Sequence, residues 1–394
     1  MPLSSLLPVS KLHKMPDYAF GQIDALKLKL INEGKEIIDL SLGSPDGPTH
    51  PKVLETLKTS MDKLRNQQYP IFSGHPALKQ AVKEWMKNRF NVEVNADQGV
   101  LPLIGSKEGI GHLAFAYIQP GDLTIVPSPY YPVHMRGSNL AGGDIYELEL
   151  KRENNFVGDL DSIPVDILRR AKIMILSYPQ NPTGAVVDRA YMEKAVKLCR
   201  EYEIILLNDF AYSEIWYDDN KPISILEIEG AMDVAIEFQT FSKTYNMSGM
   251  RLGFAVGNEK IVQTLYKLKT NLDYGVCMGV QEAGVTALGL GDEYREDIRK
   301  EYQARRDLVV KELREMGFDV YNPGGAMYIW VPIPEKYQTC FEFVQDLLEK
   351  ANVAAVPGTT FGQFGERFIR LALVQNQEKL KQAMNNIKAA GLTP

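Results

Sequence analysis

The feature that most constrains this chain is an alternation of short apolar runs and amphipathic segments between residues 100 and 257. The apolar runs are too short for buried helices and have the length of strands, whereas the segments between them have helical spacing. Strands that are apolar on both faces are typical of a parallel sheet with crossover helices on each side. The runs are VLPLIG, LTIVP, IMILSY, IILLND, AIEFQTF and LGFAVG. They predict an α/β fold with a mostly parallel sheet.

The pattern changes after residue 291. A long charged helix is expected over Asp292–Met316, followed by shorter strands and two more helices. With 394 residues the chain is longer than a single hydrophobic core usually supports. We therefore expect an N-terminal arm with part of a small domain over 1–45, a large domain over 46–290, and a smaller α+β domain over 291–394.

Composition excludes several classes of function. The net charge of −6, without a lysine or arginine block, disfavours nucleic acid and anionic membranes as partners. No stretch approaches the roughly 20 apolar residues of a membrane span. Three dispersed cysteines without a CxxC pair fit a reducing compartment, so a cytoplasmic protein is expected. The five histidines show no ligand spacing, so no metal site is expected.

The stretch 240–253, TFSKTYNMSGMRLG, lies between two predicted strands. This places Lys243 in a short connection at a strand end, with Thr240, Ser242 and Arg251 nearby. Such a group suits a lysine that holds an aldehyde cofactor as an imine beside a phosphate. The dipeptide Ser-Lys occurs three times and is uninformative alone, but the longer pattern S-K-x-x-x-x-x-G-x-R-x-G is far more specific.

Two further motifs sit where a strand ends. In IGSKEG, Ser106 and Lys107 open a predicted helix, whose free N–H groups could bind a phosphate; a plain N-cap is the simpler alternative. In SYPQNPTG, Asn181 could donate its amide to a ligand at the carboxyl end of the strand, although Asn-Pro-Thr-Gly is also good turn chemistry.

Charged and aromatic groups complete the set of candidates. Asp209 follows four apolar residues and needs a partner if buried; it could hold a pyridine nitrogen protonated, with Tyr212 turned toward the same ring. Tyr131 could stack on a flat ring, and His134 could support Asp209. Arg370 lies inside the apolar strand FIRLAL, where a guanidinium needs an anion; a carboxylate matches its fork.

Together these motifs resemble class I pyridoxal-phosphate aminotransferases, closest to the alanine-type and LL-diaminopimelate-type enzymes. The resemblance spans nearly the whole chain and rests on nine motifs in the family's order. They are SLGSPDG, QYPIFSGHPALKQA, IGSKEG, PSPYYP, YPQNPTG, NDFAY, FSKTYNMSGMRLG, NPGGAMYIW and FIRLAL. The resemblance implies an aspartate-aminotransferase-like large domain, a smaller α+β domain and pyridoxal 5'-phosphate as cofactor.

The resemblance also implies roles for the cofactor site. Lys243 would hold pyridoxal phosphate and shuttle the substrate proton, and Asp209 would keep the pyridine nitrogen protonated. Asn181 and Tyr212 would bond the ring's phenolic oxygen, Asn181 would also contact the substrate, and Tyr131 would stack on the ring. The phosphate would be held by Ser106, Lys107, Ser242 and Arg251.

For the substrate, the resemblance implies that Arg370 clamps the α-carboxylate and that Gly43 lies against the bound molecule. Tyr18 and Phe20 of the N-terminal arm would close over it. Tyr69 would reach the cofactor phosphate from a second subunit, so a homodimer with shared active sites is expected.

The identity of the amino donor is less constrained. The stretch LDYGVCMG at 272–279 carries no arginine or lysine, unlike the corresponding stretch of aspartate-selective relatives. An alanine-type donor with 2-oxoglutarate or pyruvate in a ping-pong reaction is therefore expected. LL-diaminopimelate transamination is the alternative, and a β-lyase acting on cysteine conjugates uses the same motifs. A cofactor-binding regulator is disfavoured because the arm is too short for a DNA-binding domain.

Overall fold

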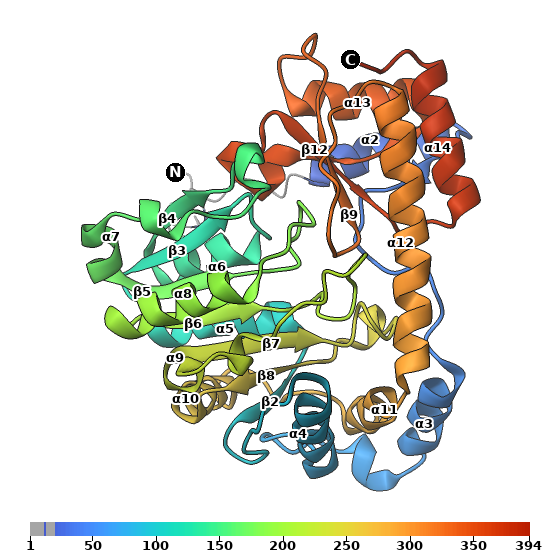
Figure 1. Cartoon of the computed structure of the whole chain (residues 1–394). Helices are drawn as coiled ribbons and strands as arrows, with labels where there is room; N and C mark the ends of the chain where they lie inside the picture. Colours follow the sequence, from blue (N-terminus) through green and yellow to red (C-terminus); the bar gives the residue numbers. More distant parts are fainter. Residues whose placement is uncertain (1–11, 13–19) are drawn as a thin grey trace, which may run out of the picture.

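The computed structural model describes residues 12 and 20–394, which form a central sheet with helices on both faces and a second layered unit beside it (Figure 1). The seven strands of the sheet are β2 (Val100–Leu103), β3 (Leu123–Ser128), β4 (Asp144–Glu149), β5 (Ala171–Leu176), β6 (Ile205–Asp209), β7 (Ala235–Thr240) and β8 (Gly253–Gly257). Their order is β2-β8-β7-β6-β5-β3-β4. The sequence therefore predicted the fold class correctly.

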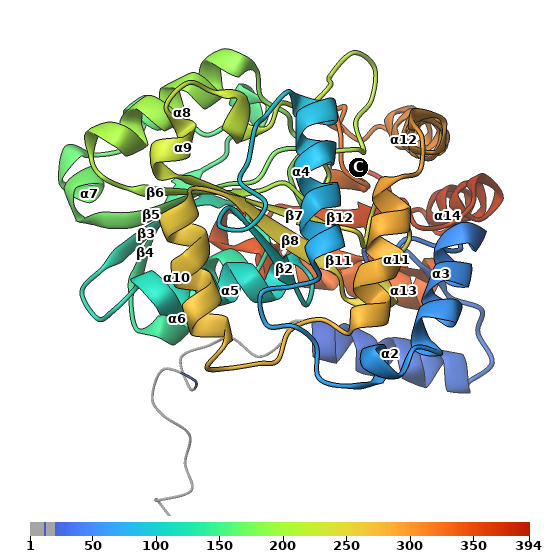
Figure 2. The ribbon, with the colours of Figure 1, turned by 90° about the horizontal axis from the view of Figure 1, so that it is seen from below.

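Helices cover both faces of this sheet, as the apolar strands predicted (Figure 2). On one face lie α5 (Ser106–Tyr117), α6 (Val133–Ala141) and α10 (Glu259–Lys269). The other face is covered by α4 (Pro76–Phe90), α7 (Val165–Arg170), α8 (Arg189–Glu201), α9 (Ala231–Val234) and α11 (Met278–Leu288). Each face forms its own buried apolar cluster, so the sheet is solvated on neither side.

The sheet is mostly parallel, as predicted, with one antiparallel strand next to its β2 edge. Strands β3 to β7 pair in parallel, but β8 runs antiparallel to both β7 and β2. A parallel connection needs a crossover that is usually a helix. The connection between β7 and β8, residues 241–252, contains only the short 3-10 turn η6 (Ser248–Met250), so the chain reverses direction there.

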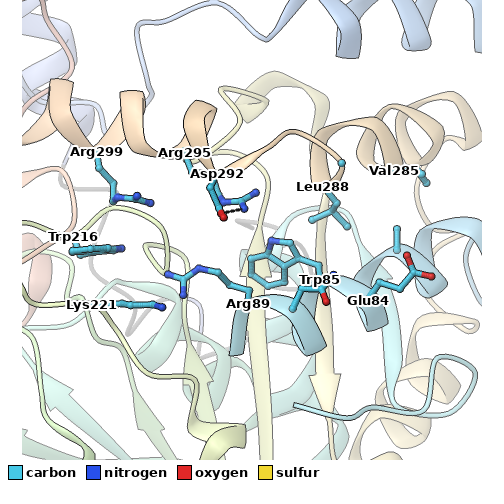
Figure 3. A pocket seen from close by; sticks show the side chains of 13 residues that line it. Glu84, Trp85, Arg89, Trp216, Lys221, Val285, Leu288, Asp292, Arg295 and Arg299 are labelled. Atoms are coloured by element: carbon cyan, nitrogen blue, oxygen red, sulfur yellow. Dashed lines mark hydrogen bonds and ion pairs between the residues drawn. The ribbon is translucent and has the colours of Figure 1, made fainter. Parts of the chain in front are cut away.

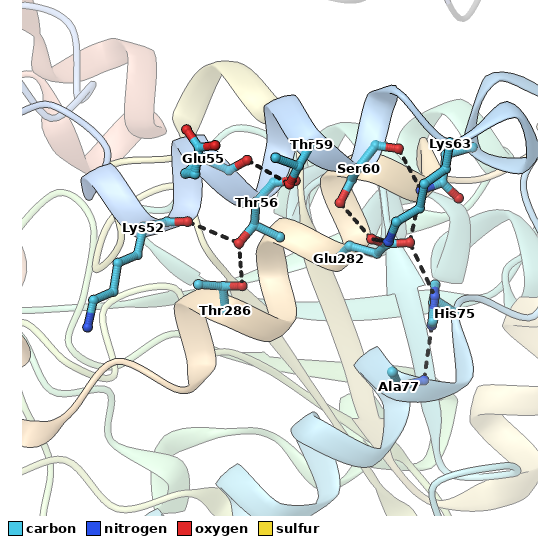
Figure 4. A network of polar contacts seen from close by, with 11 residues as sticks. Lys52, Glu55, Thr56, Thr59, Ser60, Lys63, His75, Ala77, Glu282 and Thr286 are labelled. Atoms are coloured by element: carbon cyan, nitrogen blue, oxygen red, sulfur yellow. Dashed lines mark hydrogen bonds and ion pairs between the residues drawn. The ribbon is translucent and has the colours of Figure 1, made fainter.

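A polar network joins α11 to α3 (Pro51–Met61) and the turn η2 (Leu64–Gln67), as Figure 4 shows. One oxygen of Glu282 accepts hydrogen bonds from the Ser60 hydroxyl (2.6 Å) and the Lys63 amine (2.5 Å), and the other accepts one from the Asn66 amide (2.9 Å). Burial alone would raise the pKa of Glu282, but these hydrogen bonds lower it to about 2. The carboxylate therefore stays ionised and holds the two helices together.

The second unit combines chain segments from both ends of the described sequence. Its helices are α2 (Phe20–Asn32), α12 (Asp292–Glu315), α13 (Cys340–Ala351) and α14 (Gln377–Ala389). Its strands are β1 (Ile38–Asp39), β9 (Tyr328–Pro332), β10 (Val353–Ala354), β11 (Val356–Pro357) and β12 (Phe368–Ala372). Strand β1 pairs with β10, and β12 lies between β11 and β9. These segments share one apolar cluster; the domain limits at 45 and 290 stay a prediction.

Two expectations from composition can be compared with this structure. Within the described residues, no helix is long and apolar enough to cross a lipid bilayer. The cysteines are free thiols: Cys199 and Cys340 are buried, and Cys277 is exposed.

Candidate active site

A cavity of about 330 Å³ opens at the carboxyl ends of β5, β6 and β7, facing β9 and β12 of the second unit. Open α/β sheets bind their ligands at this edge. The cavity brings together most of the residues that the sequence singled out. Those that line it are Gly43, Ser106, Lys107, Tyr131, Asn181, Asp209, Tyr212, Ser242, Lys243, Arg251 and Arg370.

Lys243 lies in the turn after β7, and its amine donates a hydrogen bond to the Gly43 carbonyl oxygen. The amine lies 5.9 Å from the centroid of the Tyr212 ring. Burial lowers the pKa of Lys243, and the nearby cations Arg370 and Arg251 lower it further. A lowered pKa favours the neutral amine, which is the form that attacks an aldehyde.

Asp209 is the last residue of β6 and is 5% exposed. Its Oδ2 lies 2.9 Å from Nε2 of His134, which confirms the expected contact between these two residues. Its Oδ1 is buried and has no hydrogen-bond partner among the described residues. A buried acceptor in this state requires a donor, and the cavity that Asp209 lines is where a ligand can supply one.

Two tyrosine hydroxyls meet beside the lysine. The Oη atoms of Tyr212 and Tyr328 lie 2.7 Å apart, and both side chains line the cavity. Burial raises the pKa of Tyr212, and Tyr328 raises it further, so this phenol stays protonated at neutral pH. A Cβ atom at Gly43 would collide with the Tyr328 hydroxyl, so only glycine allows this close approach.

Arg370 projects from β12 and is 4% exposed. Its Nη1 donates to Oδ1 of Asn181 (2.9 Å) and its Nη2 to the carbonyl oxygen of Ser41 (2.7 Å). The guanidinium lies between the rings of Tyr328 (4.2 Å) and Phe361 (4.7 Å), while its Nε has no partner among the described residues. The bond to Arg370 turns the Asn181 oxygen toward the arginine, which leaves the Asn181 NH₂ group for a ligand.

The start of α5 forms an anion cradle. Its N-cap, Gly105, has φ of 78° and offers no side-chain cap, so the first N–H groups of the helix stay available. A Cβ atom at Gly105 would collide with the Arg251 guanidinium, which therefore approaches the helix start closely. Burial lowers the pKa of Lys107, and Arg136 and Arg251 lower it further. Cations thus accumulate at this end of the cavity.

Sequence reasoning missed several residues of this cavity, including Phe361 beside Arg370, a further cation and a further tyrosine. Arg136 on α6 and Tyr328 on β9 both line it. Arg136 follows His134 by two residues and carries no motif of its own; only the start of α6 beside Tyr131 brings it to the site. Tyr328 lies in the strand-like run AMYIWVPI, where nothing in the spacing distinguishes it from its apolar neighbours.

The groups in the cavity fit pyridoxal phosphate. The helix start with Lys107 and Arg251 suits a phosphate, and the unpartnered Oδ1 of Asp209 suits a protonated ring nitrogen. Lys243 has the lowered pKa that an aldehyde-binding amine requires. Tyr131 lines the same cavity and presents an aromatic ring.

Tyr69 is not among the residues that line this cavity. Tyr69 is 72% exposed and stacks on Tyr274, with ring centroids 4.4 Å apart. Its expected contact involves a second copy of the chain, so that role stays a prediction. Tyr18 lies outside the described residues.

Comparison with known proteins agrees with this geometry. Residues 35–387 match the family model described as aminotransferase class I and II. The LL-diaminopimelate aminotransferase of Aquifex aeolicus is 42% identical, over 96% of this chain and 97% of that protein. The protein of the same name from Natranaerobius thermophilus is 44% identical, over 96% of this chain and 97% of its own length.

Solved structures place the fold in the same group. Substrate-bound BacF from Bacillus subtilis superposes with a TM-score of 0.94 at 36% identity, over 98% of both chains. An aspartate aminotransferase mutant from Thermus thermophilus has a TM-score of 0.91 at 26% identity, over 98% of this chain and 99% of that one. The chain therefore belongs to the class I and II aminotransferases, a family of enzymes that depend on pyridoxal phosphate.

Proposed function

We propose that the enzyme transfers an amino group between LL-diaminopimelate and 2-oxoglutarate by a ping-pong reaction. The observation that carries this proposal is the similarity to proteins named LL-diaminopimelate aminotransferase, which extends over almost the whole chain at 42–44% identity. It favours the alternative of the sequence analysis over an alanine-type donor.

The charges in the cavity support substrates with a second carboxylate. Lys107 and Arg136 line the cavity in addition to Arg370 and Arg251. In this proposal the substrate α-carboxylate would pair with Arg370, and the cofactor phosphate would bind at the start of α5. LL-diaminopimelate and 2-oxoglutarate both carry a distal carboxylate, which would be stabilised by Arg136. Alanine and pyruvate have no group that could use this cation.

When bound, pyridoxal phosphate would supply an electron sink for the electron pair that stays on the substrate α-carbon when its proton is removed. In our proposal Asp209, oriented by His134, keeps the ring nitrogen protonated. The lysine amine of Lys243 takes the proton from the α-carbon and returns a proton to the group that accepts it. The hydroxyl of Tyr212 and the amide of Asn181 donate to the ring oxygen, and Tyr131 stacks on the ring.

Four residues would hold the phosphate: Ser106, Lys107, Ser242 and Arg251. In the structure the Thr240 hydroxyl donates to Oγ of Ser242 (3.0 Å) and accepts from the Ser242 N–H (3.2 Å), which fixes that hydroxyl at the end of β7. Arg251 is held by the Ser248 carbonyl oxygen (3.0 Å). Fixed donors of this kind orient the cofactor without a cost in side-chain ordering when it binds.

Arg370 would bind the α-carboxylate that every amino acid and oxo acid substrate carries. Its neighbours already fix its plane, and its unpartnered Nε points to an unsatisfied binding capacity. Gly43, which lines the cavity and lies against Tyr328, would contact the substrate.

A homodimer is part of the proposal. Large apolar side chains are exposed around Tyr69: Met61, Leu64, Ile71, Phe72, Leu272 and Tyr274. Two stretches distant in sequence, 61–72 and 272–274, thus form one surface whose rings stack on one another. Such a patch is typical of a subunit interface, and Tyr69 would reach the second active site across it. We further propose a cytoplasmic location, which the free cysteines support.

One observation favours an alanine-type donor as a second candidate. Among the described residues that line the cavity, Asp209 is the single carboxylate, and His134 already contacts it. The distal ammonium of LL-diaminopimelate therefore needs a partner from another source, such as the aromatic rings of the second subunit. Alanine makes no such demand.

The test is a half-reaction with single amino acids and no oxo acid. Purified holoenzyme is mixed with LL-diaminopimelate, alanine, glutamate or aspartate, and the absorbance of the lysine-bound cofactor is followed. We expect the fastest loss with LL-diaminopimelate, and glutamate formation once 2-oxoglutarate is added. A faster reaction with alanine would replace the proposed donor by the second candidate. Release of pyruvate and ammonia from a β-substituted amino acid, with the absorbance unchanged, would instead indicate a β-lyase.

A further inference from the structure

A second cavity, of about 730 Å³, lies where α4, the end of α11, the start of α12 and the loop after β6 meet (Figure 3). It shares no lining residue with the active-site cavity among the described residues. Its volume is within the range of small-molecule binding sites. Neither the motifs of the sequence nor the proposed reaction uses it.

Cationic side chains dominate the lining of this cavity. Arg89 comes from α4, Arg295 and Arg299 from α12, and Lys221 from the loop after β6. Figure 3 shows the charged groups of Arg89, Lys221 and Arg299 directed toward a common space beside Trp216. The lining also includes the carboxylates of Glu84 and Asp292. Both of these are exposed.

The buried charges beneath the cavity do not balance. Glu214 is 1% exposed, and three guanidinium groups surround it. Its Oε1 accepts from Nε of Arg89 at 2.6 Å. Its Oε2 lies 3.7 Å from Nε of Arg295 and 3.6 Å from Nη1 of Arg299, and it makes no hydrogen bond among the described residues. Arg295 has a second carboxylate in Asp292, whereas among the described residues no acid is closer to Arg299 than Glu214.

Several donors around the cavity have no acceptor. The side chain of Arg89 is 9% exposed, and its Nη1 is buried without a hydrogen-bond partner among the described residues. The indole N–H groups of Trp85 and Trp216 are also buried without a hydrogen-bond partner among the described residues. Burying a cation or a donor without a partner is costly. Burial lowers the pKa of Arg299. The Glu214 carboxylate raises this pKa, and repulsion from the Arg89 cation lowers it.

From this arrangement we infer that the cavity binds a small anion with at least two negative charges, of the phosphate or carboxylate type. Arg89 and Arg299 offer guanidinium forks that match either kind of oxygen pair, and Lys221 adds a point charge at the rim. The anion supplies the negative charge that Glu214 alone does not provide. Its binding joins the first turns of α12 to α4 and to the loop after β6.

The site lies close to the chain segments of the catalytic groups without touching them. Glu214 follows Tyr212 by two residues. Tyr245 follows Lys243 by two residues, and its ring stacks on Tyr294 in the first turn of α12, with centroids 6.1 Å apart and planes 7° apart. An anion in this cavity therefore binds at the junction between α12 and the loops that carry the active-site residues.

The test uses holoenzyme saturated with pyridoxal phosphate, so that the phosphate site of the active cavity is filled. Binding of inorganic pyrophosphate and of citrate is measured by titration calorimetry for wild type, Arg299→Gln and Lys221→Gln. We expect one site per chain for at least one probe, weakened at least about fivefold in both variants. Lys300→Gln, an exposed change on the same helix outside the cavity, is the matched control and should bind as wild type does.

Two results would overturn the inference: neither probe binds at millimolar concentration, or all variants bind equally well. Binding of pyrophosphate alone would indicate a phosphate-type anion, and binding of citrate alone a carboxylate-type anion. Thermal unfolding gives an independent readout. The bound probe should raise the unfolding temperature of the wild type but not of Arg299→Gln.

Discussion

The clamp that we propose for the α-carboxylate can be tested with Arg370→Lys, which keeps the positive charge and removes the fork. In the structure Arg370 donates one hydrogen bond to Oδ1 of Asn181 and one to the Ser41 carbonyl oxygen. Three N–H groups remain for a bidentate carboxylate. A lysine has three donors in all, so the same two partners leave a single donor for the substrate.

The expected loss follows from this count. One charge-assisted hydrogen bond contributes about 1.5–3 kcal/mol. Each 1.4 kcal/mol is a factor of about ten, so kcat/KM should fall about 10- to 100-fold. Because both substrates carry an α-carboxylate, the values for the amino donor and for the oxo acid should fall by similar factors.

Steady-state kinetics with each substrate varied in turn measures these ratios. Arg367→Lys is the matched control. Arg367 lies just before β12, donates a hydrogen bond to the Tyr337 carbonyl oxygen (2.7 Å) and does not line the cavity. Thermal unfolding separates lost binding from lost stability. If kcat/KM fell for the amino donor alone, Arg370 would instead recognise the donor's side chain. If neither value changed, the proposed contact between Arg370 and the α-carboxylate would be refuted.

Three further outcomes are expected. Lys243→Ala should bind the cofactor without covalent attachment and show no turnover, with circular dichroism unchanged; normal turnover would exclude Lys243 as the catalytic base. Arg136→Gln should raise KM for 2-oxoglutarate about 5- to 10-fold and leave KM for pyruvate nearly unchanged, since only the former has a distal carboxylate. Equal effects on both would exclude that role. Glu282 has a folded pKa of about 2, below its usual 4.5, so it stabilises the fold above pH 4.5 and this contribution fades as the pH falls toward 2. Glu282→Gln should therefore unfold at a lower temperature than the wild type at pH 7, and the difference should shrink by pH 3; a constant difference would contradict the linkage.

The residues that we propose for the cofactor could be predicted to lie together because they follow strands. Asp209 and Lys243 each come directly after or soon after an apolar run, and parallel strands bring such positions to one edge. Arg370 was detectable for a different reason, since a cation inside an apolar strand demands an anion. In each case a strong local pattern fixed the position of the side chain.

The parts that escaped prediction depend on tertiary packing. Arg136 reaches the cavity through the placement of α6, and Tyr328 through the pairing of β9 with β12. The direction of β8 could not be predicted from its residues, because a buried antiparallel strand inside the sheet is as apolar as a parallel one. The arginines of the cationic cavity at α12 come from two helices, α4 and α12. The sequence could not predict this cavity because it depends on how these helices pack against each other.

The hydrogen bond between Ser41 and Arg370 joins positions 329 residues apart, and β1 pairs with β10 across a similar span. Contacts of such high sequence separation form late and slowly in folding. During synthesis the large sheet can form while the ribosome still holds the last strands, because β2 to β8 end at residue 257. Lys243 and its turn are then present before Arg370 has been synthesised. If Arg370 binds the α-carboxylate as proposed, a nascent chain gains this binding site only after Arg370 has emerged and formed its hydrogen bond with Ser41, which is synthesised early.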